Sequence, residues 1–476
     1  MLHDYLLSGR PLHPLPFAEC FYVHYPKVAF GHWPPVFYIV EAFWFLVFGV
    51  KIAAARWLCA CITAGCAVAL YRRCRMDWGR WPALTVTALF LALPVIRQQT
   101  WLVMSDLLLA GFVFLALCSL ADCLNTGKTS DALWLALWSS LAILTKGTGW
   151  LLLGPIAAGP LVTGRIRVYL SRSYWLAIVL IGIASAPFYI LMARLNLGYP
   201  ASFEWYLLRL RSMLPALLIL GAILALALYR FLPRKPLSPT QTVSAVLMVW
   251  GLVLVAFINL VPLTPELLRY YIAAVAPAAY LLAGAIVIVP YGKALASVVC
   301  AGLLVGFIAL PVNSTKAYSQ AMGAVPLAQG QMVLVESDSG GEGALIAARL
   351  ERDPKRSTYL VRGTKFLEMS DWSGVHYTSR YAAAGPLRAA LDGADPDYVV
   401  VDTSAPLTAD ARLLREVLQG SADRWQAIAR VPVRLSFRSG ELLVYRRGPE
   451  GRRSGAPLSV QLGPERGQQT FSCKAQ

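Results

Sequence analysis

The stretch with the densest reactive chemistry is His24–Pro35, HYPKVAFGHWPP, which directly precedes the first long apolar run. It holds two histidines, Lys27 and three aromatic residues. Cationic groups of this kind, Lys27 and His32 above all, can stabilise the charge of a phosphate. The alternative is an interfacial belt of aromatic and basic residues that anchors a helix at a membrane surface. The stretch alone leaves both interpretations open; on the first, it is part of a site for an anionic, lipid-linked substrate.

Three more charged residues lie in or beside apolar runs. Asp106 opens the run in VMSDLLLAG, where a charge is costly and usually paired or functional, although a helix N-terminus also favours a carboxylate. Lys146 lies in AILTKGTGWLLLGP, at the tip of a hairpin between two short apolar runs. Its ammonium suits a phosphate oxygen, and the alternative is a lysine that snorkels to the interface. Arg269 begins RYYIAAVAPAAYLLAG after a loop and is a candidate anion contact.

The composition is that of a polytopic membrane protein. The 476 residues are 57% hydrophobic and only 14% charged, whereas soluble domains are about a quarter charged. Lys and Arg number 43 against 26 Asp and Glu. We reject nucleic acid as a partner because the basic residues lie in short loops between apolar runs, where they orient helices. The nine cysteines show no metal spacing. Cys59 and Cys61 form a CxC pair that is better explained by packing than by metal.

About ten apolar runs are compatible with spanning helices, which need roughly 20 residues each. A further run, Pro34–Val50, contains Glu41 and a Pro-Pro start, and these features favour an interfacial helix. The expected spans are Ile52–Leu70, Trp81–Ile96, Leu102–Ala121, Ala132–Thr145, Thr148–Val162, Tyr174–Ala193, Met213–Tyr229, Thr242–Leu260, Tyr270–Pro290 and Ala294–Val312.

Loop charge orients these runs. Basic residues cluster in three loops, and the positive-inside rule makes all three cytoplasmic. Ten spans and an interfacial Pro34–Val50 place both termini, Asp106, Lys146 and Arg269 on the extracytoplasmic side. If Pro34–Val50 spans the membrane instead, the later spans keep their sides and the N-terminus moves to the cytoplasm. The three clusters are Arg72, Arg73, Arg75 and Arg80; Arg165, Arg167 and Arg172; and Arg230, Arg234 and Lys235.

The composition changes after Val312, and the sequence predicts four domains or segments. Residues 1–50 form an extracytoplasmic or interfacial segment, 51–312 the transmembrane domain, 313–447 an extracytoplasmic α/β domain, and 448–476 a disordered tail. Strands are expected at Met332–Glu336, Thr358–Val361, Tyr398–Asp402 and Glu441–Tyr445, with helices at Gly343–Glu351 and Ala409–Leu418.

Two weaker signals have plainer explanations. Ser337–Gly343, SDSGGEG, follows a strand and precedes a helix, but it lacks the GxGxxG spacing, so an ordinary strand-to-helix turn is favoured over a phosphate loop. Tyr199–Arg211 is aromatic and basic and is either an acceptor groove or, as we favour, an ordinary interfacial segment.

The candidate residues occur in a recognisable order over residues 1–312. The order is HYPKVAFGHWPPVFYIVEAFWFLVFG, AARWL, MSDLLLAGFVFLAL, AILTKGTGWLLLGP and ELLRYYIAAVAPAAYLLAG. In this order the chain resembles the GT-C glycosyltransferases of the protein O-mannosyltransferase and lipid A aminoarabinose transferase type. The resemblance implies a polyprenyl-phosphate sugar as donor and transfer on the extracytoplasmic face, in a bacterial inner or plasma membrane.

The resemblance also implies roles for single residues. His32, with the following Pro-Pro pair, matches the family's Lys/His-Pro-Pro element, and Asp106 matches the acid that opens a later helix. Lys146 matches the lysine assigned to the lipid phosphate, and Arg269 the arginine of an RY motif. One element has no match: the family's Asp-Glu motif, whose Asp is the expected base. We expect that base to lie upstream of Met1.

The sequence therefore favours a glycosyltransferase, for hexose or pentose, with a lipid, glycan or protein acceptor and with membrane lipid around it. Lys27, His32, Lys146 and Arg269 are expected to bind the donor phosphate, and Asp106 to orient donor or acceptor. No cofactor is expected, and a need for a divalent metal stays open. The alternatives are a non-catalytic or truncated GT-C protein, inactive because the base is absent, and a transporter or flippase. The latter ranks lower because mid-helix charges are few and no internal repeat is visible.

Overall fold

The computed structural model describes residues 1–9, 17, 21, 25, 34–194, 235–260, 269–309, 316–370, 377–435, 438–448, 459–461 and 468–470. The chain divides into two compact units. One contains Gly31–Gly49 and Ala53–Leu310, and the other Met1–Phe30, Val50–Ile52 and Pro311–Gln476. The expected class, a polytopic helical membrane protein with a small C-terminal α/β domain, is confirmed.

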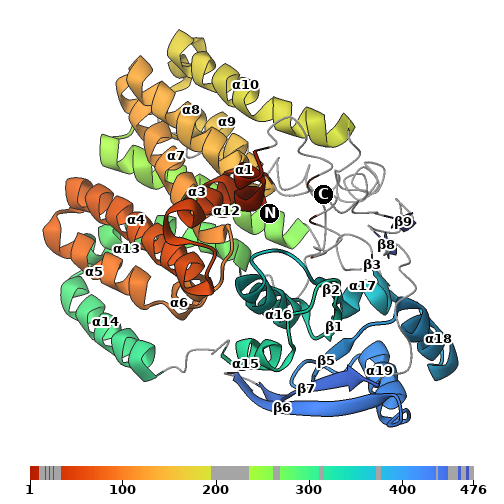
Figure 1. The fold of residues 1–476 in the computed structure, drawn as a ribbon. Helices are drawn as coiled ribbons and strands as arrows, with labels where there is room; N and C mark the ends of the chain where they lie inside the picture. Colours follow the sequence, from red (N-terminus) through yellow and green to blue (C-terminus); the bar gives the residue numbers. More distant parts are fainter. Residues whose placement is uncertain are drawn as a thin grey trace. The chain divides into compact units, whose positions relative to one another are not determined.

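The first unit is helical throughout its described residues (Figure 1). Its elements are α3 (Val36–Phe48), α4 (Ile52–Trp78), α5 (Arg80–Ala92), α6 (Pro94–Trp101), α7 (Asp106–Thr126), α8 (Thr129–Ile143), the 3-10 helix η1 (Gly147–Leu152), α9 (Leu153–Val162), the 3-10 helix η2 (Ile166–Leu170), α10 (Arg172–Arg194), α12 (Pro239–Leu260), α13 (Ile272–Ile288) and α14 (Gly292–Ala309).

Fewer helices are long enough to span a membrane than the sequence suggested. Within the described ranges, five helices are long and apolar enough, or six if α5 and α6, bent by 57° at their junction, form one span. The expected number of about ten is not reached within these ranges. The 15-residue helix α8 measures about 22 Å, less than the roughly 30 Å of a bilayer core. The pair of η1 (6 residues) and α9 (10 residues) also has fewer residues than the roughly 20 that a crossing needs. The expected span Met213–Tyr229 lies outside the described residues.

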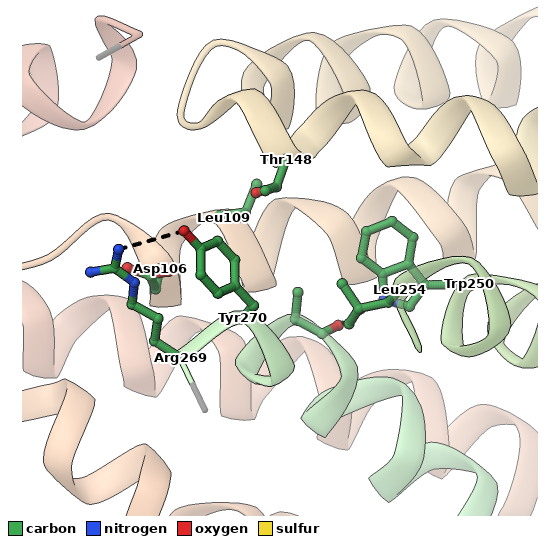
Figure 2. A pocket seen from close by; sticks show the side chains of 8 residues that line it. Asp106, Leu109, Thr148, Trp250, Leu254, Arg269 and Tyr270 are labelled. Carbon is green, nitrogen blue, oxygen red and sulfur yellow. Dashed lines mark hydrogen bonds between the residues drawn. The ribbon is translucent and has the colours of Figure 1, made fainter. Parts of the chain in front are cut away.

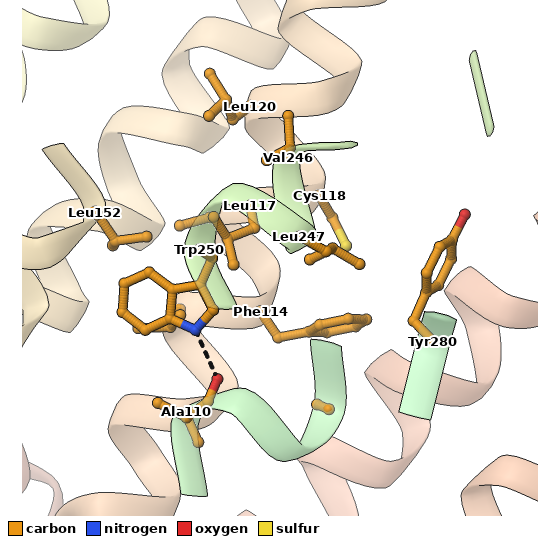
Figure 3. Packing of buried hydrophobic residues seen from close by; sticks show 14 of the residues in the cluster. Ala110, Phe114, Leu117, Cys118, Leu120, Leu152, Val246, Leu247, Trp250 and Tyr280 are labelled. Atoms are coloured by element: carbon orange, nitrogen blue, oxygen red, sulfur yellow. Dashed lines mark hydrogen bonds between the residues drawn. The ribbon is translucent and has the colours of Figure 1, made fainter. Parts of the chain in front are cut away.

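Helix α7 forms the centre of the helical unit. Its buried residues lie on all sides, as expected of a helix enclosed by others. Phe114 and Leu117 belong to the same buried cluster as Trp250 of α12, and Figure 3 shows this packing. The indole Nε1 of Trp250 donates a hydrogen bond to the carbonyl oxygen of Ala273 in α13, 3.0 Å away. This bond satisfies the one polar atom of a side chain that is 1% exposed.

An ion-pair cluster joins three helices at the end of α7 that is distant from Asp106. Arg73 was expected in a loop, but α4 continues to Trp78, so Arg73 lies in the helix and is buried. It donates to Asp77 and to Asp122 of α7, each at 2.8 Å. The hydroxyl of Tyr280 in α13 donates to Asp77 at 2.6 Å. A buried guanidinium needs such partners because desolvation is costly.

The second unit contains a five-stranded sheet in the order β2-β1-β5-β7-β6. The strands β1, β2 and β5 are parallel, and β7 and β6 continue the sheet antiparallel. The four expected strands are all present, whereas β6 and α18 were not predicted. The strands are β1 (Met332–Glu336), β2 (Tyr359–Arg362), β5 (Tyr398–Asp402), β6 (Trp425–Leu435) and β7 (Arg438–Arg447).

Helices cover both faces of this sheet (Figure 1). Val333, Val335 and Val400 face the side of α15 and α16, while Leu334 and Val399 face α18 and α19. Of the expected turn Ser337–Gly343, only Ser337 and Asp338 lie between β1 and α16, because α16 already begins at Ser339. Asp338 caps α16 by accepting from the amide of Gly341 at 2.7 Å. The helices are α15 (Lys316–Ala324), α16 (Ser339–Arg352), α17 (Gly363–Phe366), α18 (Ala384–Ala394) and α19 (Ala409–Gln419).

Described residues from the N-terminus pack on the same unit. Helix α1 (Leu2–Leu7) carries Asp4, which accepts from Arg356 at 2.9 Å. The hydroxyl of Tyr25 donates to Asp353 at 2.8 Å. Two short strand pairs complete the unit: β3 (Glu368–Ser370) with β4 (Tyr377–Ser379), and β8 (Ser459–Gln461) with β9 (Gln468–Thr470). The tail predicted to be disordered thus contains paired strands in its described residues.

Candidate functional site

Three chain segments far apart in sequence meet at one end of the helical unit. Helix α7 begins at Asp106, the loop after α8 carries Lys146, and Arg269 and Tyr270 directly precede α13. Asp106 and Asp122 lie at opposite ends of α7, so this site is distant from the Arg73 cluster. The sequence-predicted residues Asp106, Lys146 and Arg269 are therefore brought together.

Lys146 and Asp106 form a buried ion pair. The ammonium Nζ of Lys146 donates to Oδ1 of Asp106 at 2.6 Å, and the two residues are 4% and 3% exposed. The same ammonium lies 4.8 Å from the centre of the Tyr270 ring, a cation–π distance. Lys146 therefore points into the protein and does not snorkel. Each charge is held by the other, because either one alone would be strongly disfavoured at this depth.

A pocket opens beside this pair, and Figure 2 shows its lining. Its cavity volume in this structure is about 10 Å³, which is room for about one water molecule. Arg269 donates to the hydroxyl of Tyr270 at 3.5 Å, and its guanidinium lies 5.3 Å from the centre of that ring. The lining residues are Asp106, Leu109, Thr148, Trp250, Leu254, Arg269, Tyr270 and Ala273.

Local backbone contacts fix the loop that carries Lys146. The amide of Gly149 donates to the carbonyl of Lys146 at 2.8 Å, so the chain turns back on the end of α8. A Cβ on Gly149 would lie 2.6 Å from the carbonyl carbon of Ala142, so only glycine permits this approach. The amide of Val36, the first residue of α3, donates to the carbonyl of Leu144 at 3.0 Å. The Pro-Pro start of α3 is thereby held against the same loop.

The remaining predicted ligands, Lys27 and His32, lie outside the described residues. Tyr270, Thr148 and Trp250 line the pocket but were not selected as site residues from the sequence. Tyr270 and Thr148 are one and two positions from selected residues, and that proximity was the only available signal. Trp250 lies in an apolar run where nothing distinguishes a pocket residue from one facing lipid.

The chemistry of the lining suits an anion with polar substituents. Arg269 in the lining and Lys146, which is paired with the lining residue Asp106, bring two positive charges against one carboxylate, so the site carries a formal excess of one positive charge. Two buried oxygens, Oδ2 of Asp106 and Oγ1 of Thr148, accept or donate no hydrogen bond within the described part of the chain. In the same part, no three His, Cys, Asp or Glu side chains gather closely enough to hold a metal ion.

Comparison with known proteins supports the resemblance seen in the sequence. Residues 32–190 match the sequence model of the family described as dolichyl-phosphate-mannose-protein mannosyltransferase. This match confirms the similarity to GT-C glycosyltransferases, and the matched range contains Asp106 and Lys146. No curated protein sequence matches significantly.

Two solved structures are similar in fold. One is ArnT from Cupriavidus metallidurans in the apo state, with 14% identity over 90% of this chain and 91% of that chain and a TM-score of 0.45. The other is ArnT from the same organism bound to undecaprenyl phosphate, with 13% identity over 92% and 93% and a TM-score of 0.43.

Proposed function

We propose that this integral membrane chain, whose residues 32–190 match a mannosyltransferase family, is a glycosyltransferase that moves a sugar from a polyprenyl-phosphate donor to an acceptor on the extracytoplasmic face. The observation that carries the proposal is the buried Lys146–Asp106 pair beside Arg269, at one end of the helical unit. Buried charges at the end of a membrane bundle are expensive and mark substrate sites by default.

Charge matching supports a phosphate donor. A sugar phosphodiester carries one negative charge, which equals the excess positive charge contributed by Arg269 and Lys146 over Asp106. Transfer of the sugar leaves a phosphate monoester whose charge approaches about −2. Cations placed where this charge develops favour the transition state over the ground state. We assign Lys27 and His32 to stabilise the additional negative charge of the leaving phosphate. They precede Pro35 in the sequence by eight and three positions.

The distribution of basic residues supports the proposed orientation. Asp106, Lys146 and Arg269 lie at one end of α7, α8 and α13. Arg73, by contrast, pairs with Asp122 near the opposite end of α7, and Arg165 follows the end of α9. The positive-inside rule makes the arginine-rich end cytoplasmic. The site then faces the extracytoplasmic side of a bacterial inner or plasma membrane, where the acceptor would be a lipid, a glycan or a protein.

The proposed reaction breaks the bond between the sugar and its phosphate oxygen and forms a bond to an acceptor hydroxyl or amine. The leaving phosphate keeps the bonding electrons, and Arg269 stabilises them as charge. The acceptor proton goes to a general base. Asp106 is not assigned this role because Lys146 already occupies one of its carboxylate oxygens; it orients the sugar instead.

Binding of undecaprenyl phosphate to the purified full chain in nanodiscs tests the first half of this proposal. We expect Arg269→Ala to weaken binding by about 10- to 100-fold, the range for a lost hydrogen bond to a charged group. Arg172→Ala removes an exposed arginine at the start of α10 and serves as the matched control. Equal binding by wild type and Arg269→Ala would contradict the phosphate role.

Transfer tests the second half. Radiolabelled sugar on undecaprenyl phosphate is supplied to membranes that contain the full chain, and label in lipid, glycan and protein fractions is counted. We expect Arg269→Ala to abolish transfer while Arg172→Ala retains it. If the chain binds undecaprenyl phosphate tightly but transfers no mannose, glucose, galactose or aminoarabinose, it is a non-catalytic member of the fold.

A further inference from the structure

We infer that Tyr189 of α10 is a positioning residue for Lys146: it fixes the loop that carries this lysine, so that the ammonium stays beside Asp106. The catalytic meaning of the inference rests on the proposed function, because Lys146 and Asp106 belong to the proposed donor site. Tyr189 is not among the residues that line the pocket, and the sequence pattern did not select it. It acts on the site only through the loop.

The end of α8 lies directly before Lys146, and its last carbonyl groups need hydrogen-bond donors. An α-helix leaves its last four carbonyls without a partner in the helix. The carbonyl of Ala142 accepts from the amide of Lys146 at 3.1 Å. The carbonyl of Ile143 accepts from the hydroxyl of Tyr189, also 3.1 Å away. A side chain of α10 thereby caps α8 immediately before the loop turns toward Asp106.

Tyr189 also contacts the chain that follows Lys146. Its ring lies 5.5 Å from the ring of Trp150 in η1, at an interplanar angle of 62°, which is an edge-to-face contact. A Cβ placed on Gly147 would lie 4.0 Å from the Tyr189 hydroxyl, so this hydroxyl lies directly beside the loop. One side chain thus contacts the chain on both sides of Lys146. A displacement of the loop breaks the hydrogen bond, the ring contact or both.

Helix α10 is a firm support for these contacts because it packs along α8 (Figure 1). At the start of the two helices, the hydroxyl oxygens of Thr129 and Ser173 lie 3.0 Å apart. At the other end, Tyr189 reaches Ile143. The two helices therefore run in the same direction and are joined at both ends. A group held by a neighbouring rigid element is placed more precisely than one held by its own loop.

The position of the ammonium matters because its interactions are short. Nζ of Lys146 lies 2.6 Å from Oδ1 of Asp106 and 4.8 Å from the centre of the Tyr270 ring. A buried ion pair stabilises only when its geometry is good. A cation lowers the barrier of a reaction only if it already lies where charge develops. Misplacement by about 1 Å can cost on the order of 100-fold in rate. The short 3-10 helix after Lys146 has weaker internal hydrogen bonds, so an outside contact is needed.

The test measures how fast an amine-reactive reagent labels Lys146 in the full chain in nanodiscs without ligand, by mass spectrometry. Lys146 is 4% exposed, so labelling requires the loop to open. Tyr189→Phe removes the hydroxyl and keeps the ring. We expect it to raise the labelling rate of Lys146 by about 2- to 10-fold, the factor for one lost neutral hydrogen bond. Lys128, exposed at the start of α8, should be labelled equally fast in wild type and variant.

Tyr174→Phe is the matched control, because the Tyr174 hydroxyl donates to the carbonyl of Ile156 from the other end of α10. This variant should leave the labelling rate of Lys146 unchanged. Cys74 of α4 is 0% exposed, so its reaction with a thiol reagent reports a general loosening of the bundle. Equal labelling of Lys146 in wild type and Tyr189→Phe would overturn the inference. A parallel rise at Cys74 would overturn it as well, because it would show a merely structural role.

Undecaprenyl phosphate separates this inference from the proposed function. The variants are compared without ligand, so the comparison holds whether or not the chain binds a lipid phosphate. Undecaprenyl phosphate added to wild type should slow the labelling of Lys146, because the proposed phosphate site lies beside the Lys146–Asp106 pair. If it does not, although Tyr189→Phe raises the rate, the proposed phosphate site fails and the positioning of Lys146 by Tyr189 is supported.

Discussion

Lys146 donates to Asp106 at 2.6 Å and so joins the loop after α8 to the first residue of α7. The two residues are 40 positions apart in the sequence, and both are almost fully buried. This pair changes the role expected for Lys146. The sequence suggested a lysine free to bind phosphate, whereas the structure places its ammonium between a carboxylate and the ring of Tyr270. Lys146 contributes charge to the site from a fixed position.

Removal of either partner of this pair should destabilise the protein more than removal of both. Asp106→Asn leaves a buried ammonium without its counter-charge, and Lys146→Met leaves a buried carboxylate. Each should lower the free energy of unfolding by about 3 kcal/mol, typical of a broken buried pair. The double variant removes both charges, so it should recover most of that loss. Reversible unfolding in detergent measures the cycle, and additive losses would mean that the pair does not form.

Two glycines in the same loop provide a matched test of its geometry. Gly149→Ala should destabilise by about 2 kcal/mol or more, because its Cβ would meet backbone atoms of Ala142 and Ile143 at 2.6 Å, and backbone cannot yield cheaply. Gly147→Ala should leave thermal stability unchanged, since the nearest atom to its Cβ is the Tyr189 hydroxyl at 4.0 Å. Differential scanning fluorimetry of both variants checks this. Equal melting temperatures would contradict the close approach of the loop to α8.

The sequence predicted helices and strands with strong local patterns better than it predicted which elements and side chains contact one another. The buried strands Met332–Glu336 and Tyr398–Asp402 match their predicted bounds, because continuous apolar runs between turn residues have few other solutions. Strand β6 was not predicted, since its alternating pattern of exposed residues includes Pro432 and three arginine or glutamine side chains. Its pairing with β7 is a tertiary effect that local pattern does not encode.

The same holds for the candidate site: the sequence indicated its charged residues but not their contacts. A charge in an apolar run identified Asp106, Lys146 and Arg269 one by one. Nothing in the sequence indicated that Lys146 would pair with Asp106 rather than face a ligand, because that depends on how the hairpin packs on α7. Arg73 was assigned to a loop for a related reason: its partner Asp122 is 49 positions away in α7, and a local pattern shows only a basic cluster.

The bond from Tyr25 to Asp353 should tie the N-terminal segment to the C-terminal unit. Tyr25→Phe removes a buried hydroxyl that donates to Asp353 at 2.8 Å and lies 3.3 Å from the hydroxyl of Thr358, and it should cost about 1 kcal/mol or more. Tyr5→Phe is the matched control, because the Tyr5 hydroxyl makes no hydrogen bond to the described residues. Hydrogen exchange of the full chain, read on peptides that cover α1, should show faster exchange in Tyr25→Phe only. Identical exchange in both variants would rule out the tie.

Glu336 should make the C-terminal unit less stable as the pH rises toward neutrality. This residue ends β1, is 6% exposed, and has one carboxylate oxygen without a hydrogen bond in the described chain. Burial raises its pKa to about 7, and Asp402, Glu342 and Asp338 act in the same direction, while Arg415, 4.0 Å away, acts against them. The folded state therefore binds more protons than the unfolded state between about pH 4.5 and pH 7.

The sign of this linkage fixes the outcome. The protonated carboxyl is favoured by folding, so the contribution of Glu336 to stability is fully present below about pH 4.5 and is lost as the pH rises through about 7. The loss is of the order of 3 kcal/mol at most. Glu336→Gln keeps a neutral side chain at every pH, so exchange of β1 and β5 amides should depend less on pH between 5 and 8 than in wild type. At pH 8 the variant should exchange more slowly. Exchange rates are corrected for the intrinsic rate at each pH. If wild type and variant then show the same pH dependence, Glu336 is not held in the protonated form.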